Sequence, residues 1–257
     1  GLFATDSRLL VLQKLGDPLV ILSELIDFEF FRKPMEKVLY SSRDEKKGGR
    51  PPFDPVLMFK ILVLQRYYNL SDDRLEFQIN DRRTFMRFLG MDDGALVPDA
   101  KTIWLFRDQL QKAGLIEMLF GLLTAHLEQR GIIGNEGQIV DATFVEVPRQ
   151  RNSRDENKEI KAGGVPGDWN QQPHKRCQKD VDARWTKKNG QSYFGYKNHV
   201  LCDKKSKLLK EYAVTDAAMH DSEVLAALLA EGGARGQELY ADSAYRSAII
   251  EESFKAR

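Results

Sequence analysis

The stretch that decides the fold is residues 138–147, which read QIVDATFVEV. β-branched and aromatic residues dominate it, and a glycine and a proline flank it, so the stretch predicts a β-strand. Asp141 stands in the middle of this apolar run. Because burying an unpaired carboxylate costs several kcal/mol, Asp141 either lies on a solvated face of the strand or binds a cation.

A second acid ends a second predicted strand. Residues 237–246 read QELYADSAYR, which indicates a short strand up to Asp242 and then the start of a helix. Two carboxylates on separate strands of one sheet suit a divalent cation such as Mg²⁺, which takes oxygen ligands. Asp141 and Asp242 are therefore the candidate metal ligands, with an exposed, unliganded Asp141 as the alternative.

Composition excludes several other classes of protein. The chain has 257 residues and a net charge of +1, with 42% hydrophobic and 30% charged residues, as in ordinary globular domains. It contains no apolar run of eighteen residues and no signal-peptide pattern, so we expect neither a membrane span nor secretion. Cys177 and Cys202 lie far apart without a CxxC pattern, which indicates reduced thiols and no zinc or disulfide framework.

The first half of the chain predicts a helical domain over residues 1–134. Asp54 before Pro55, Ser71, and Asp99 are each placed to cap the start of a helix, and Gly90 is placed to end one. Three short helices with tight turns near residues 54–90 resemble a helix-turn-helix arrangement.

Three arginines of this segment are candidate DNA contacts. Arg82, Arg83 and Arg87 would share one side of the third helix, while its aromatic residues pack inward. Contact with phosphates is one interpretation. A solvated basic face is the other.

Residues 148–190 form a basic insertion. They contain eleven Lys and Arg residues against six Asp and Glu residues, with the run GGVPG at 163–167. We expect a long flexible loop without regular structure, which suits a polyanion lying across the two acids. A disordered, solvated loop is the alternative.

The remaining elements complete the expected architecture. Residues 193–203 and 208–214 predict a β-hairpin, followed by a helix capped by Asp221 or Ser222 and then by the Asp242 strand. This order of elements over residues 135–257 is the ribonuclease H-like layout, in which acids on the first and fourth strands are neighbours. The expected fold class is α+β, with a helical N-terminal domain and a ribonuclease H-like α/β domain on a mixed sheet.

Short motifs along most of the chain then support a resemblance. The chain resembles the DDE-class transposases of bacterial insertion sequences, in the group named after insertion sequence five. The matching segments are PPFDP at 51–55, VPDAKTI at 97–103, FR at 106–107, VDAT at 140–143, DARW at 182–185, YFGYKNH at 193–199, VT at 214–215, HDS at 220–222 and ADSAY at 241–245.

The resemblance implies metal-dependent cleavage and strand transfer at the ends of a mobile element. It implies that Asp141 and Asp242 are catalytic acids that bind Mg²⁺ or Mn²⁺. It also implies double-stranded DNA as partner, both terminal repeats and target, with a homo-oligomer on the DNA in the bacterial cytoplasm, at the nucleoid. Lys197 and His199 lie in a matching segment and are further candidate DNA contacts, with ordinary hydrogen-bonded residues as the alternative.

The family's third acid, a Glu on a later helix, has no counterpart here. Glu251 and Glu252 are too close to Asp242 in the sequence to be assigned that role. We therefore expect a C-terminally truncated domain that is catalytically incompetent. A non-catalytic DNA-binding repressor or remnant, and a metal-dependent nuclease of the same fold, are the alternative functions.

Overall fold

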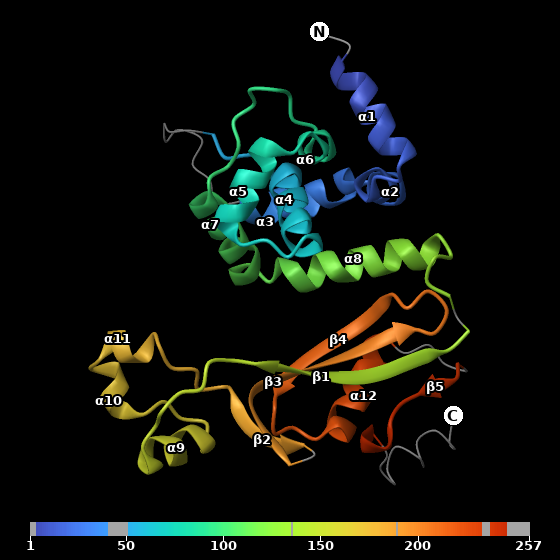
Figure 1. The fold of residues 1–257 in the computed structure, drawn as a ribbon. Helices are drawn as coiled ribbons and strands as arrows, with labels where there is room; N and C mark the ends of the chain where they lie inside the picture. Colours follow the sequence, from blue (N-terminus) through green and yellow to red (C-terminus); the bar gives the residue numbers. More distant parts are fainter. Residues whose placement is uncertain (1–3, 41–50, 135, 189, 233–236, 246–257) are drawn as a thin grey trace. The chain divides into compact units, whose positions relative to one another are not determined.

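The computed structural model describes residues 4–40, 51–134, 136–188, 190–232 and 237–245 (Figure 1). The chain divides into an N-terminal unit, residues 1–123, and a C-terminal unit, residues 124–257. The division falls inside helix α8 (Leu115–Gln129), whereas the sequence suggested a boundary near residue 134. Among the described residues, no helix combines the length and the apolar character that crossing a bilayer requires.

The N-terminal unit is helical throughout its described residues, as the sequence predicted. Before the first turns of α8 it contains α1 (Ala4–Lys14), α2 (Pro18–Leu25), the 3-10 helix η1 (Phe28–Phe31), α3 (Arg32–Leu39), α4 (Pro55–Tyr67), α5 (Asp72–Asp81), α6 (Arg83–Leu89) and α7 (Ala100–Lys112). Four residues, 68–71, connect α4 to α5, whereas Arg82 alone separates α5 from α6.

The predicted helix caps are confirmed by their hydrogen bonds. Asp54 Oδ1 accepts from the Leu57 amide at 2.9 Å, at the start of α4. Ser71 Oγ accepts from the Arg74 amide at 3.3 Å before α5, and Asp99 Oδ1 accepts from the Thr102 amide at 2.6 Å before α7. Each bond satisfies an amide that the first turn of a helix leaves without a partner.

A polar network fixes three of these helices to one another. The Arg107 guanidinium on α7 forms two hydrogen bonds to the Asp72 carboxylate on α5, at 2.9 and 2.8 Å. The buried Gln65 side chain of α4 donates to the same carboxylate and accepts from Arg107. The bidentate pair raises the pKa of Arg107 and lowers the pKa of Asp72, so both groups stay charged.

The C-terminal unit contains a five-stranded mixed sheet (Figure 1). Its strands are β1 (Gln138–Glu146), β2 (Arg184–Lys188), β3 (Gln191–Asp203), β4 (Leu209–Asp216) and β5 (Leu239–Tyr240). The order is β2-β3-β1-β5, with β4 also paired to β3. β1 is antiparallel to β3 and parallel to β5. Helix α12 (Asp221–Gly232) covers one face and packs Leu225 and Leu228 against Val140 and Leu201.

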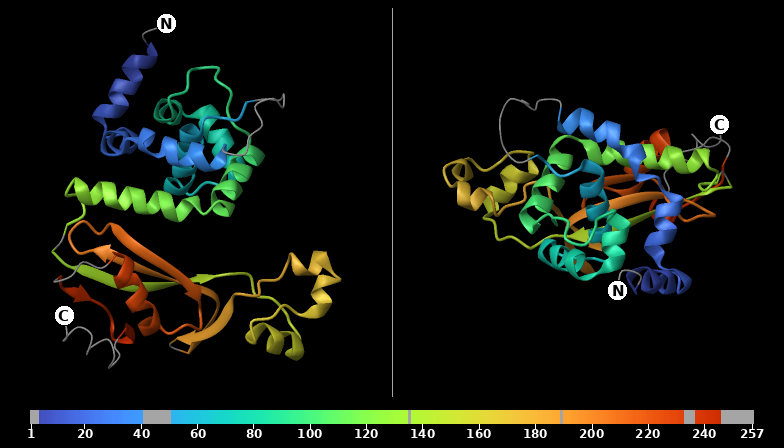
Figure 2. Two further views of the ribbon diagram at one scale, coloured as in Figure 1. Left: turned by 180° about the vertical axis from the view of Figure 1, so that it is seen from behind. Right: turned by 90° about the horizontal axis from the view of Figure 1, so that it is seen from above.

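Residues 148–183 are not the flexible loop that the sequence predicted. They contain α9 (Arg154–Lys161), α10 (Gly167–Asn170) and α11 (Pro173–Arg176), which lie together in both side views (Figures 1 and 2). Trp169 is fully buried, and its Nε1 donates to Glu156 at 2.7 Å. Hydrogen bonds from Lys175, Trp169 and the Ser153 amide lower the pKa of Glu156 to about 2. A buried indole and a network around one carboxylate therefore organise this basic segment.

Candidate active site

Asp141 lies on β1, and Asp242 follows β5, the strand that pairs with β1 in parallel. The parallel register of β1 and β5 pairs Gln138 with Leu239 and Ile139 with Tyr240. Asp141 comes two residues after the last paired residue of β1, and Asp242 comes two residues after the last paired residue of β5, just before the 3-10 helix η2 (Ser243–Tyr245). Because side chains alternate along a strand, Asp141 falls on the face opposite Val140 and therefore opposite α12.

Both carboxylates are exposed, and each accepts a hydrogen bond from a backbone amide close to it in the sequence. Asp141 Oδ1 accepts from the Ala142 amide at 2.8 Å, and Asp242 Oδ1 accepts from the Ala244 amide at 2.9 Å. Within the described ranges, neither acid forms a salt bridge with Lys, Arg or His. Two like charges on adjacent strands repel each other until a cation lies between them.

This donor set fits a hard divalent cation. In the part of the chain that the structure describes, no third His, Cys, Asp or Glu joins the pair to form a cluster. Mg²⁺ is commonly bound by one or two carboxylates and completes its octahedron with water and phosphate oxygens. Burial and the charge of Asp141 raise the pKa of the Cys202 thiol.

A buried polar group lies on the α12 side of the sheet, behind the acids. His199 is fully buried, with Nδ1 3.3 Å from the Tyr245 hydroxyl and Nε2 3.1 Å from Thr215 Oγ1. The Tyr245 amide in turn donates to the Asp242 carbonyl at 3.2 Å. Burial raises the pKa of the Tyr245 hydroxyl, and the charges of Asp221, Asp141 and Asp242 raise it further. Tyr245 therefore connects His199 to the turn that carries Asp242.

Lys197 and His199, which were candidate DNA contacts, are both buried in this fold. Lys197 is 9% exposed, and its Nζ donates to Asp221 Oδ1 at 2.9 Å and to the Met219 carbonyl at 2.7 Å. The pKa of His199 is lowered by burial, with Asp221 opposing and Lys197 adding to the shift. Both side chains project toward α12 because they alternate with outward-facing neighbours on β3. Asp221 thus pairs with Lys197. The neighbouring His220 has a local contact, in which its Nδ1 accepts a hydrogen bond from the Ser222 amide at the start of α12.

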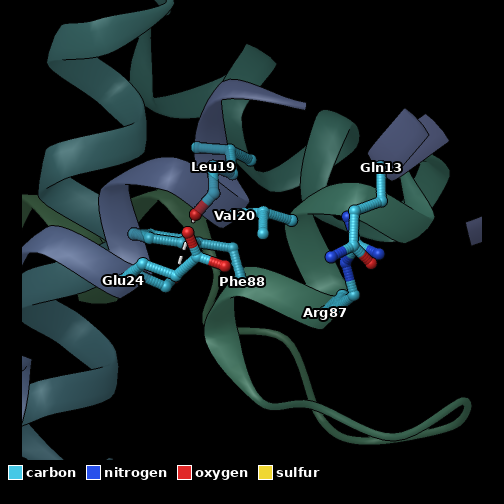
Figure 3. A pocket seen from close by; sticks show the side chains of 7 residues that line it. Gln13, Leu19, Val20, Glu24, Arg87 and Phe88 are labelled. Carbon is cyan, nitrogen blue, oxygen red and sulfur yellow. Dashed lines mark hydrogen bonds between the residues drawn. The ribbon is translucent and has the colours of Figure 1, made fainter. Parts of the chain in front are cut away.

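The three arginines that were candidate DNA contacts near α6 have different surroundings. Arg87 Nη2 lies 2.6 Å from Asp17 Oδ2, and Nη1 donates to the Leu9 carbonyl, so this arginine joins α6 to the segment between α1 and α2. Figure 3 shows it beside Gln13, at one end of a pocket of about 330 Å³. Arg82 precedes α6, and its guanidinium lies over the Phe85 ring. Arg83 is exposed on the first turn of the helix.

Two further residues belong to the site although the sequence analysis did not assign them. Tyr245 follows Asp242 by three residues, the spacing of one helical turn, and this spacing could have indicated from the sequence that the two residues lie close together. Thr215 had no such signal, because its contact with His199 depends on the register of β3 and β4. Glu251 and Glu252 lie outside the described residues.

Two family models match the chain. Residues 133–257 match the model described as "Transposase DDE domain". Residues 7–109 match the model described as "Transposase domain (DUF772)". No solved structure matches the chain. The first match contains the sheet and both acids, and the second covers most of the helical N-terminal unit.

Proposed function

We propose, from the transposase domains that both parts of this chain carry, that the protein is a DDE transposase acting at the ends of an insertion sequence of the group named after insertion sequence five. Asp141 and Asp242 bind the divalent cation, Mg²⁺ or Mn²⁺, at which DNA strands are cut and joined. The observation that supports this proposal is the parallel pairing of β1 and β5, beyond which each chain segment continues by two residues to an exposed carboxylate.

The chain's own residues prepare this site before DNA arrives. The Ala142 and Ala244 amides each orient one carboxylate oxygen, which leaves the second oxygen of each acid available. The His199–Tyr245 contact holds the turn after β5. When bound, divalent ions activate a water or a 3′-hydroxyl and stabilise the leaving oxygen of a phosphodiester. Asp141 and Asp242 would hold such an ion next to the scissile phosphodiester.

The fold and the partners follow from the same proposal. The mixed sheet with α12 on one face supports a ribonuclease H-like catalytic domain. The four-residue connection between α4 and α5 supports a helix-turn-helix-like role for the N-terminal unit in binding double-stranded DNA of the element ends. We expect a homo-oligomer on DNA, since two ends are processed together.

A nicking assay tests the function. Supercoiled plasmid carrying the DNA that flanks the gene is incubated with the protein and Mg²⁺ or Mn²⁺. Strand cleavage that depends on the two acids should give nicks at the element ends that Asp141→Asn and Asp242→Asn lose, and it would overturn the expectation from the sequence that the chain is catalytically incompetent. Asp168→Asn, an exposed acid of α10, is the matched control and should nick normally.

The alternatives give different results in the same assay. Specific binding of the ends without nicking by the unaltered chain would identify a repressor or a remnant. Nicking without preference for the ends would identify a nuclease of the same fold. Nicking that persists in both Asn variants would remove the two acids from the chemistry.

A further inference from the structure

An exposed tryptophan lies on the same sheet face as Asp141. Trp185 of β2 is 50% exposed, although burying a large aromatic ring normally stabilises a fold by more than any other residue type. Its ring contacts the Phe194 ring across the strands, with centroids 5.1 Å apart. The Arg149 guanidinium, at the exit of β1, lies 5.5 Å from the Trp185 ring centroid.

The strand registers place this ring relative to the acids. Trp185 pairs with Phe194 on β3, and Asp141 pairs with Val200 on the same strand. Phe194 and Val200 are an even number of residues apart, and cross-strand partners share a face, so Trp185 and Asp141 point to one side. Lys187 is two residues beyond Trp185 and therefore points to this side as well, where it is exposed.

We propose that Trp185, with Arg149 and Lys187, is a stacking site for an unpaired base of the DNA strand that passes the two acids. Single-stranded DNA is typically bound by exposed aromatic rings next to cations that follow the phosphates, and the bound base stacks on the ring. The charge of the surrounding segment agrees with this ligand, because residues 148–190 carry eleven basic against six acidic residues. This site rests on the proposed function for its DNA substrate.

The geometry also gives the position of the stacked base. Phe194 and Val200 are six residues apart on β3, which is roughly 20 Å at 3.3 Å per residue. The charges of one strand recur about every 3.4 Å along the axis of a duplex, so this length corresponds to about six nucleotides of duplex and to fewer nucleotides of an extended unpaired strand. Trp185 thus contacts the strand at a distance from the phosphate that is cut, and it is a binding residue without a part in the chemistry.

Fluorescence without metal tests the site independently of cleavage. Trp169 is buried, and Trp104 of the N-terminal unit is 49% exposed, so Trp104→Phe leaves Trp185 as the one exposed indole of the described residues. In this background with EDTA present, we expect a single-stranded oligonucleotide to quench the emission. Trp185→Ala should weaken single-strand binding by about 5- to 150-fold, the usual effect of removing one stacked base.

Matched variants separate stacking from other effects. Trp185→Phe keeps an aromatic ring and should retain most of the single-strand affinity, and circular dichroism should show both variants folded. Trp104→Ala removes an equally exposed indole and should leave single-strand affinity unchanged. Duplex DNA should bind the Trp185→Ala variant within twofold of the unaltered protein.

Several results would overturn the proposal while leaving the function intact. One is equal single-strand affinity for Trp185→Ala and the unaltered protein. Another is an equal loss of affinity for single-stranded and duplex DNA in Trp185→Ala, which would mean that Trp185 supports the fold or the charge of the surface and does not stack on a base. A third is a change from dimer to monomer in sedimentation, which would make the β2 edge an interface between copies of the chain. Failure of the protein to bind DNA of either kind would instead refute the proposed function itself.

Discussion

Replacing Gly195 with alanine tests whether the close approach of β1 and β3 supports the strand that carries Asp141. Gly195 pairs with Glu146 in the antiparallel ladder and has a φ of +148°, which L side chains rarely adopt. A Cβ at this position would fall far inside van der Waals distance of the Val145 carbonyl oxygen. It would also lie 3.1 Å from the Val147 nitrogen.

The magnitude follows from two costs. Non-glycine residues in this backbone region cost about 1–3 kcal/mol, and forcing extra atoms into a packed contact costs about 1–3 kcal/mol more. The contacting atoms are backbone, so they cannot relax by a rotamer change. We expect Gly195→Ala to lower the free energy of unfolding by about 2–6 kcal/mol, a large share of the total of a typical domain.

Urea unfolding followed by tryptophan fluorescence and circular dichroism measures this loss. The matched control is Gly190→Ala, since Gly190 has φ +81° but a Cβ there would meet nothing within 4 Å. The control should lose about 1–2 kcal/mol from backbone strain alone. A loss for Gly195→Ala no greater than that of Gly190→Ala would refute the close approach of the two strands.

The other predictions concern two buried contacts. Burial lowers the pKa of His199 in the folded protein. The unfolded chain therefore takes up this proton at a higher pH than the folded protein does, and stability falls as the pH drops below about 6.5. The urea midpoint of the unaltered protein should fall between pH 7.5 and pH 5.5, and His199→Gln should make this fall smaller. The exposed His174→Gln should leave the fall unchanged. The same pH dependence in all three proteins would contradict this role of His199. Arg87→Ala breaks the pair with the buried Asp17 and should destabilise the N-terminal unit by about 1–3 kcal/mol without changing the salt dependence of DNA binding. If stability were unchanged and the slope of log affinity against log salt concentration fell in magnitude by about 0.9, Arg87 would instead be a phosphate contact.

Local signals in the sequence predicted the helices and the strands of the acids. The caps at Asp54, Ser71 and Asp99 are short-range chemistry, in which a side chain satisfies an amide two or three residues away. The apolar run around Asp141 likewise gave β1. These features depend on neighbours along the chain, so one sequence is enough to recognise them.

The errors have physical causes of a different kind. Lys197 and His199 read as surface residues because a buried lysine or histidine depends on partners from α12 and β4, far away in the sequence. The segment 148–183 read as a loop because its glycines and charges outnumber its apolar residues. Its structure depends on Trp169 and on the Ser153–Glu156 capping box, a pattern of serine followed three residues later by glutamate that the sequence does contain.

The most direct test of the central claim, that Asp141 and Asp242 share one divalent cation, is iron-dependent cleavage of the polypeptide itself. Fe²⁺ replaces Mg²⁺, and ascorbate with peroxide then cuts the backbone close to the bound ion. A shared ion should give fragments that end near residues 141 and 242 in the same sample. Excess Mg²⁺ should reduce them, Asp141→Asn and Asp242→Asn should abolish them, and Asp168→Asn should leave them unchanged. Cuts near one acid alone, or cuts that persist in either Asn variant, would contradict a shared metal site.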